Sequence, residues 1–243
     1  MPAAEVLILA MTKMLSGVCT AGMTVERHPR SVLKWVRPVR EFDTLLPGDV
    51  TCAGGRLFCC CDVVEMNLLA PRPEPPHVED WVTDFVQRPP RLRRRLEGAR
   101  RARFLADHLD RAPEQVIVDH TRSLCLIQPE RIRASFSLDR YSCKYEARMS
   151  VVLPGGIDHP AASSRRGLPV TDLKWRALGR AWLREEGQSR LALDHEALLE
   201  RLSGEAIYLS LGLSRSWRNM VWLLVVGVHV VPDYPGGFDP QDL

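Results

Sequence analysis

Hydrophobic residues in the first seventy positions come in short runs separated by turn residues. Residues 5–11 form a continuous apolar run of the kind that a buried strand shows, and residues 17–23 alternate small and apolar side chains. Residues 32–39 are rich in β-branched and aromatic side chains up to Pro38, where we expect the strand to stop. A turn at residues 48–50 and a further strand within residues 54–69 follow. Several short strands at such close spacing predict a small barrel or a sandwich.

The pattern changes at residues 71–76, where four of six residues are proline. A proline-rich stretch of this kind predicts a stiff, extended connector. Beyond it, four apolar side chains fall on one face of a helix: Val78, Trp81, Val82 and Phe85. Together with the arginine-rich stretch that follows, they predict an α-helical bridge over residues 77–112.

Strand patterns return from about residue 114. Residues 115–120 and 123–129 are short and apolar. Residues 141–153 alternate, with Tyr141, Cys143, Tyr145, Ala147, Met149 and Val151 on one face and Ser142, Lys144, Glu146, Arg148 and Ser150 on the other.

Helices are predicted at 172–185 and 194–203, with strands at 206–214 and 220–231. Thr171 or Asp172 is the expected N-cap of the first helix, and Trp175, Leu178 and Trp182 form its apolar stripe. The predicted domain organisation is a first β domain at 1–76, a bridge at 77–112, a second β domain at 113–231 and a loop-like tail at 232–243.

The apolar first strand followed by Lys13, SGVCTAG at 16–22 and WVRPV at 35–39 resembles the start of the dual-OB-domain family of prokaryotic proteins. Thr171-Asp172 with Trp175, and the closing LSLGLS, are similar to the second half of that family. The resemblance implies a mainly β fold with helical insertions (α+β), in which one chain carries two OB-like barrels. Members are described as nucleic-acid-binding or nucleic-acid-modification proteins. The resemblance therefore implies a nucleic-acid-binding module of a processing or defence system, with a modifying enzyme or a protein-assembly subunit as alternatives.

The charge composition is compatible with that function without requiring it. The formal net charge is only +3, but 4 of the 33 basic residues are lysines and the other 29 are arginines. Arginine pairs bidentately with phosphate and stacks on bases, which suits a nucleic-acid partner. A GC-rich genome would produce the same bias.

Eight arginines lie within residues 88–103, with Glu97 as the only acidic residue among them. Such density is self-repulsive without an anionic partner or nearby carboxylates. Three interpretations remain open: a solvated helix face paired with the acids at 79, 80 and 84, a phosphate-binding surface, or a docking surface for an acidic protein.

A second candidate surface follows from OB barrels, which bind single strands by stacking bases on aromatic side chains inside a basic groove. Trp35 and Arg37 share a strand face with suitable chemistry, although the same pattern fits a core tryptophan with an arginine at the barrel rim. Lys144 and Arg148 form either a second groove wall or an ordinary exposed face. The full candidate interface is Lys13, Lys34, Trp35, Arg37, Arg40, Arg91, Arg93, Arg94, Arg95, Arg100, Arg101, Lys144 and Arg148.

No linear motif assigns a catalytic residue, a metal or a cofactor. The triplet Cys59-Cys60-Cys61 would alternate between the faces of a strand and could not converge on one ion, so we interpret it as a buried strand. His229, Asp233 and Asp239 could form an acid–base or metal-binding group, but the favoured interpretation is a loop in which Pro and Gly explain the same residues. Seven cysteines, an odd number, favour reduced thiols in the cytoplasm, and no apolar run is long enough to span a membrane. The expected partners are DNA or RNA and other protein subunits.

Overall fold

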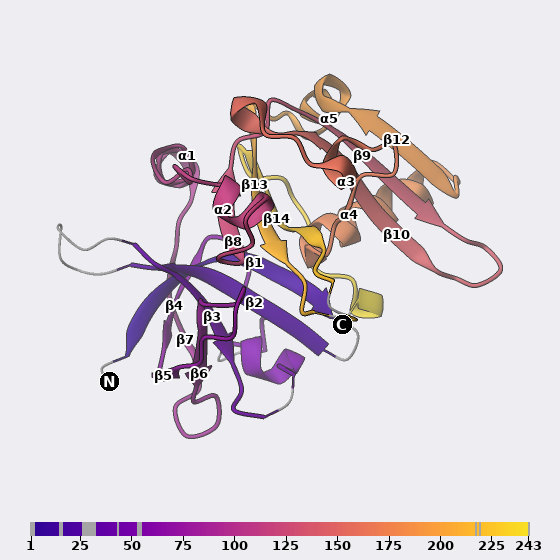
Figure 1. Cartoon of the computed structure of the whole chain (residues 1–243). Helices are drawn as coiled ribbons and strands as arrows, with labels where there is room; N and C mark the ends of the chain where they lie inside the picture. The colour runs from indigo at the N-terminus through magenta and orange to yellow at the C-terminus, as the bar shows by residue number, and fades with distance from the viewer. Residues whose placement is uncertain are drawn as a thin grey trace.

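The computed structural model describes residues 3–14, 17–25, 33–42, 44–52, 55–216, 218 and 220–242. Within these residues the chain forms two curled β units that lie against each other (Figure 1). The fold is mainly β with helices, as the sequence predicts. No described helix has the length and apolar character needed to cross a membrane.

The first unit is a barrel because its fourth strand and the continuation of that strand, the fifth, pair with different neighbouring strands. Its strands are β1 (Ala4–Met14), β2 (Gly17–Thr24), β3 (Trp35–Val39), β4 (Asp62–Met66), β5 (Leu68–Pro71), β6 (Asp80–Thr83) and β7 (Arg91–Arg95), with a 3-10 turn η1 (Pro47–Val50). β4 pairs with β1, and after the single residue Asn67 the chain continues as β5 and pairs with β6. β6 runs parallel to β3, and β3–β2–β1 are antiparallel neighbours. The ring β1–β2–β3–β6–β5/β4 therefore closes around an apolar core that includes Val6, Ile8, Val36, Phe58 and Met66.

The second unit is a curled sheet around a larger core. It contains β8 (Leu124–Ile127), β9 (Arg131–Leu138), β10 (Tyr145–Val152), β11 (Leu168–Pro169), β12 (Arg190–Asp194), β13 (Ala206–Leu213) and β14 (Leu223–Val231). A four-stranded sheet, β11–β10–β9–β12, meets a three-stranded sheet, β14–β13–β8, at the parallel bridge between Val170 and Val225. The core includes Phe136, Trp175 and Trp182, whose rings pack edge-on or tilted at 5.7–6.3 Å.

The helices lie in the segments that connect the strands along the chain. They are α1 (Gly98–Asp107), α2 (Glu114–Ile117), α3 (Pro160–Ser163), α4 (Leu173–Glu185) and α5 (His195–Leu202), with 3-10 turns η2 (Pro154–Gly156) and η3 (Pro240–Asp242). α4 begins at the predicted N-cap: Asp172 accepts a hydrogen bond from the backbone N–H of Trp175 at 2.8 Å. Its first residue, Leu173, is fully buried in the core of the first barrel, so α4 joins the two units.

The two units touch closely along β1 and β14. A side chain at Gly227 would place its Cβ 2.2 Å from the backbone oxygen of Leu9, so only glycine fits there. Around this contact Ala10, Ala21, Leu124 and Val226 form a small apolar cluster, with Trp35 packed on it. Small side chains let the strands approach, which is why the outer face of the first barrel is largely covered here.

Several secondary-structure predictions are wrong. The α-helical bridge predicted over 77–112 is largely wrong, because residues 80–83 and 91–95 form β6 and β7 of the first sheet and only α1 is helical in it. Residues 115–120, predicted as a strand, begin in the short helix α2. Cys60 and Cys61 lie in the turn before β4 instead of inside a strand. Tyr141 and Cys143, predicted to share a strand face with Tyr145, lie exposed in the β9–β10 loop, while Tyr145 to Val151 alternate as predicted.

Candidate functional site

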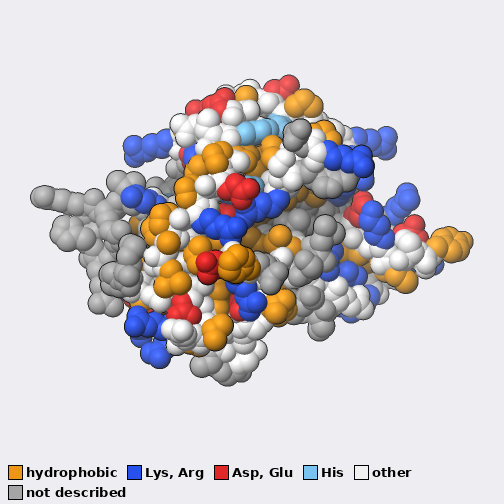
Figure 2. Space-filling model, turned by 60° about the horizontal axis from the view of Figure 1, so that its bottom comes forward, with side chains coloured by type: hydrophobic (Ala, Val, Ile, Leu, Met, Phe, Trp, Pro, Cys, Tyr) orange, Lys and Arg blue, Asp and Glu red, His pale blue; other side chains and the backbone are white. Residues whose placement is uncertain are grey.

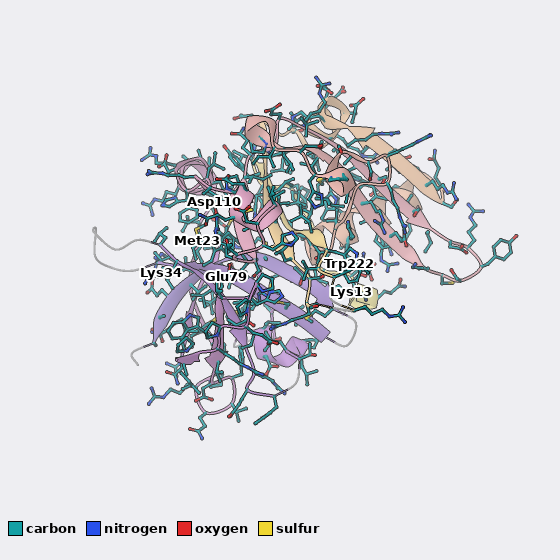
Figure 3. The ribbon with its side chains drawn as sticks, viewed as in Figure 1. Lys13, Met23, Lys34, Glu79, Asp110 and Trp222 are labelled. Atoms are coloured by element: carbon teal, nitrogen blue, oxygen red, sulfur yellow. The ribbon has the colours of Figure 1, made fainter. Side chains whose placement is uncertain are left out.

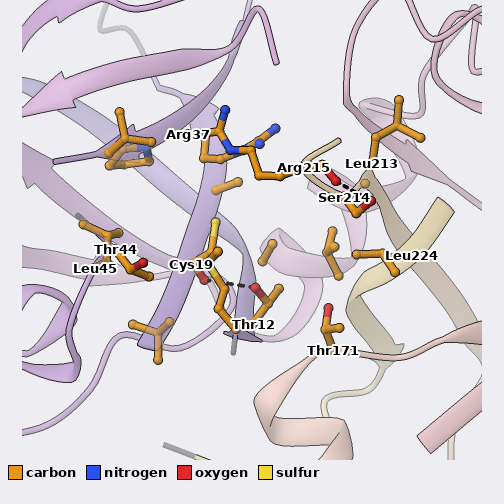
Figure 4. A pocket seen from close by; sticks show the side chains of 18 of the residues that line it. Thr12, Cys19, Arg37, Thr44, Leu45, Thr171, Leu213, Ser214, Arg215 and Leu224 are labelled. Carbon is orange, nitrogen blue, oxygen red and sulfur yellow. Dashed lines mark hydrogen bonds between the residues drawn. The ribbon is translucent and has the colours of Figure 1, made fainter. Parts of the chain in front are cut away.

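A deep cleft lies between the two units, with a volume of about 1300 Å³. One wall comes from the outer face of β1–β2–β3, including Cys19, and from the loop that contains Phe42. The other wall comes from the adjoining ends of β13 and β14, including Ser214 and Trp222. Figure 4 shows Thr12 and Cys19 of the first barrel facing Leu213, Ser214 and Leu224 of the second unit. This cavity is larger than most small-molecule pockets, which favours a segment of a polymer as its occupant.

Cationic and aromatic side chains line the cleft together. Its basic residues are Lys13, Arg37, Arg40, Arg72, Arg176 and Arg215, against the acids Glu41 and Glu74. Two aromatic side chains on the lining are exposed: Phe42 at 76% and Trp222 at 42%. In Figure 3 Lys13 and Trp222 lie near each other at the cleft, whereas Lys34 lies on the far side of the first barrel. The cleft therefore combines positive charge with ring faces that water can reach.

The cations at the cleft mouth are held in place by short contacts. Arg72 donates to the backbone oxygens of Arg40 (3.2 Å) and Glu41 (2.6 Å), which position its charge, and it forms no ion pair with a carboxylate among the described residues. Arg40 pairs with Asp49 at 2.8 Å. The Lys13 ammonium lies 3.6 Å from the buried carboxylate of Asp242 and donates to the backbone oxygen of Gln241 at 3.3 Å. Ordered cations lose less conformational entropy when an anion binds.

Beneath the cleft, a buried polar network joins the units. Arg37, which is 6% exposed, donates to Nδ1 of His77 (2.5 Å) and to the hydroxyl of Ser123, and lies 3.9 Å from Glu79. The carboxylate of Glu79 accepts hydrogen bonds from the backbone N–H groups of Ser123 (2.8 Å) and Leu124 (3.1 Å) and from the Ser123 hydroxyl (2.8 Å). These bonds connect β3 and the β5–β6 segment of the first barrel to the start of β8 in the second unit.

A second branch of the network reaches the cleft surface. His77 donates from Nε2 to the backbone oxygen of Ser214 (3.1 Å), and Arg215 donates to Asp80 (2.5 Å). Figure 4 shows Arg37 and Arg215 close together at one end of the cleft. Burial raises the pKa of Asp80 above its ordinary value, although Arg37 and Arg215 oppose the shift. The network therefore fixes the geometry of both cleft walls.

Two histidines in the contact between the units are held neutral. Burial and, secondarily, the Arg37 guanidinium lower the pKa of His77 to about 3. Burial likewise lowers the pKa of His229 to about 3, and its Nε2 lies 3.0 Å from the hydroxyl of Ser210. Their ordinary pKa is 6.5. Between pH 6.5 and pH 3 the unfolded chain therefore binds more protons at these sites than the folded chain does, and stability is lost as the pH falls.

This difference predicts a measurable acid sensitivity. We expect the free energy of unfolding to fall by about 1 kcal/mol for each of the two histidines between pH 7 and pH 5.5. Urea denaturation followed at both pH values checks it. In a His77→Gln variant, whose amide can replace both hydrogen bonds of the ring, about half of the fall should disappear. An unchanged pH dependence in that variant would show that His77 is not held neutral.

The structure separates the residues of the candidate interface suggested by the sequence. Lys13 and Arg40 line the cleft. Arg37 also lines it but is buried in the network, and Trp35 is half-buried against the second unit, so neither side chain has a free face for a phosphate or a base. Lys34 is exposed away from the cleft.

The arginine cluster is divided between a strand and a helix. Arg93, Arg94 and Arg95 are exposed on the edge strand β7 and pair with Glu65, Glu5 and Asp62, not with the acids at 79, 80 and 84 that the sequence suggested. Arg101 is 4% exposed and donates to the backbone oxygen of Val230, which attaches α1 to the second unit. Arg91 and Arg100 remain exposed to solvent. The surface in Figure 2 shows blue side chains interspersed with red and orange ones, without a field of one sign across that face.

Lys144 and Arg148 lie on the outer face of the second unit, where both contact Glu146 at 2.9 and 3.5 Å. They are far along the chain from the cleft lining and do not contribute to it.

Sequence reasoning missed the aromatic residues of the cleft. Trp222 lies in an apolar run that predicts a core strand, yet it precedes β14 and is exposed. Phe42 lies among charged residues in a loop. An isolated aromatic side chain in a polar loop was the sequence feature that could have indicated an exposed ring at a binding site. Among the described residues, no group of three or more His, Cys, Asp or Glu side chains could hold a metal ion.

Comparison with known proteins agrees with the two-unit architecture. Residues 4–228 match the sequence model of a protein family described as the dual OB-containing domain. The chain therefore belongs to this family and carries OB folds. No curated protein and no solved structure matches the chain significantly. OB folds commonly bind oligonucleotides, through the face of their second and third strands and the adjoining loops.

Proposed function

We propose that the protein is a non-catalytic module that binds single-stranded nucleic acid in the cleft between its two OB units. The supporting observation is the position of the cleft. It lies on the β2–β3 face of the first barrel and beside the β5–β6 loop, which are the elements that OB folds use for oligonucleotides. The side chains gathered there, cations with exposed aromatic rings, are those that such binding needs.

Each group in the cleft has a role in this proposal. Lys13, Arg40 and Arg72 face the phosphates, because their charges lie at the cleft mouth and are already ordered. Phe42 and Trp222 provide stacking faces for unpaired bases, which a duplex would not offer. The buried network around Arg37 holds the two walls at a fixed separation.

The biological setting of the proposal is a prokaryotic nucleic-acid-processing or defence system in the cytoplasm, in which the protein presents the strand to other subunits. The dual-OB family supports a binding role. The buried Ser–His pair in the contact between the units, Ser210 and His229, is fully enclosed and does not open onto the cleft, so it does not argue for a modifying enzyme.

The test is the binding of labelled single-stranded and duplex DNA and RNA at several salt concentrations, with charge-matched variants. Lys13→Gln/Arg72→Gln removes two cleft charges, and Arg93→Gln/Arg94→Gln removes two exposed charges from β7. We expect the cleft variant to lose about tenfold or more in single-strand affinity and to flatten the salt slope by about 1.4, because two phosphate contacts are lost.

The β7 variant should bind the single strand like the unaltered protein. Equal losses in both variants would mean that binding is a general effect of charge, and a loss in the β7 variant alone would move the site to the arginine cluster. Absence of nucleic-acid binding at every salt concentration would overturn the proposal in favour of a protein-assembly subunit.

A further inference from the structure

A second basic surface covers the outer face of the four-stranded sheet in the second unit. Outward-facing positions of three adjacent strands meet there in register: Arg133 of β9 lies opposite Ser150 of β10 and Asp194 of β12, and Ser137 lies opposite Glu146 and Arg190. Arg131 extends the row on β9. The side chains at the centre of this face are small serines, so the longer cationic side chains around them extend further from the sheet.

The positive charges on this face exceed the negative ones. Its cations are Arg131, Arg133, Arg140, Lys144, Arg148, Arg166 and Arg190, and its acids are Asp139, Glu146 and Asp194. Glu146 alone contacts Lys144 (2.9 Å), Arg148 (3.5 Å) and Arg166 (3.9 Å), and these cations hold its pKa below the ordinary value.

The other two acids are occupied by the backbone. Asp139 accepts from the N–H groups of Tyr141 (2.8 Å) and Ser142 (3.0 Å), and Asp194 caps α5 by accepting from Ala197 (3.0 Å). Within the part of the chain that the structure describes, Arg131, Arg133 and Arg190 form no ion pair with a carboxylate. Arg190 lies beyond ion-pair distance of Asp139, so the three guanidinium groups keep donors for an external anion.

The shape of the face complements this charge. A depression of about 470 Å³ lies at its end beside the β9–β10 hairpin, where the cations Arg140, Lys144 and Arg190 line it together with the acids Asp139 and Glu146. The hairpin projects beyond the rest of the second unit, so the face is open to a large partner (Figure 1). Successive outward positions on a strand are about 7 Å apart and neighbouring strands about 5 Å apart, so the cations form a lattice that can follow a charged backbone.

We propose that this face binds the phosphate backbone of a nucleic-acid duplex, next to the single strand held in the cleft. The inference rests on the proposed function of the cleft. A duplex suits the face because only Tyr141, at the tip of the hairpin, could stack on an unpaired base, whereas serine hydroxyls and arginines serve backbone contacts. The favoured ligand of the whole protein is then a duplex that continues into a single-stranded tail.

The experiment compares three labelled probes: a single strand, a blunt duplex and a duplex with the same single strand as a tail. The face variant is Arg131→Gln/Arg133→Gln, and the matched control is Arg91→Gln/Arg100→Gln, which removes two exposed arginines elsewhere. We expect the tailed duplex to bind the unaltered protein at least tenfold tighter than the single strand does. The face variant should lose this gain, with a salt slope flatter by about 1.8, and keep its single-strand affinity.

The outcomes separate the two proposals. A face variant that binds the tailed duplex like the control overturns the duplex surface and leaves the cleft standing; this is also the result expected if the face serves an acidic protein. Equal weakening of single-strand binding in the face variant would place the single strand itself on this surface and overturn the duplex assignment. If the unaltered protein binds the duplex probes but not the single strand, the cleft proposal fails while the loss caused by the face variant still reports on the duplex surface.

Discussion

Replacing Glu79 with alanine is expected to lower the free energy of unfolding by about 3–5 kcal/mol, because it breaks a buried charge pair. Glu79 is 6% exposed and satisfies the backbone N–H groups of Ser123 and Leu124, the Ser123 hydroxyl and the charge of Arg37. Its removal leaves three buried donors without their acceptor and leaves Arg37 with Asp80, 3.5 Å away, as its remaining buried counter-charge. Breaking a buried ion pair and leaving buried donors unsatisfied costs several kcal/mol, more than the loss of an ordinary hydrogen bond.

Urea denaturation followed by circular dichroism measures this effect, and Glu74→Ala is its control. Glu74 pairs with Arg215 at 3.4 Å, but its side chain is 71% exposed, so its loss should change stability by no more than about 1 kcal/mol. Similar small effects of both substitutions would show that the two units are not joined through Glu79.

Replacing Phe42 with alanine is expected to weaken single-strand binding by about 5- to 150-fold, since stacking contributes about 1–3 kcal/mol per base. The ring is 76% exposed, so its removal should leave the thermal unfolding midpoint almost unchanged. Tyr141→Ala is the matched control, because Tyr141 is fully exposed and lies outside the cleft. Fluorescence anisotropy with a labelled single strand checks both variants. Unaltered affinity in Phe42→Ala, or an equal loss in Tyr141→Ala, would remove base stacking from the cleft.

The sequence predicted the fold better than the site. Apolar runs and alternation located β1, β2, β8, β10, β13 and β14, and cap and stripe residues located α4. The alternation of Trp35 and Arg37 on one strand face was also correct. What the pattern could not show is that the second unit covers that face, because the contact depends on Gly227 and Ala10 approaching from distant parts of the chain.

The arginine-rich segment was misread for a related reason. The sequence of β7 has no strand propensity of its own, and its conformation is set by pairing with β4. The carboxylates that neutralise it, Glu5, Asp62 and Glu65, lie on neighbouring strands and not in the adjacent sequence. The local pattern therefore predicted a helix, with the acids at 79, 80 and 84 as its candidate partners, where the fold makes an edge strand paired with other carboxylates.

The cleft forms only where the two units pack against each other, so no linear sequence motif could predict it. Arg72 and Trp222 are separated by 150 residues and meet only because the barrel closes at Asn67 and β14 packs on β1.

Ultraviolet cross-linking of a short single strand, followed by peptide mapping, tests the central claim most directly because it locates the bases on the protein. The account predicts adducts on Phe42 or Trp222, in the peptides that line the cleft. Their yield should fall when unlabelled single strand competes. Adducts confined to the peptide that spans residues 88–103, with none on either cleft wall, would contradict it.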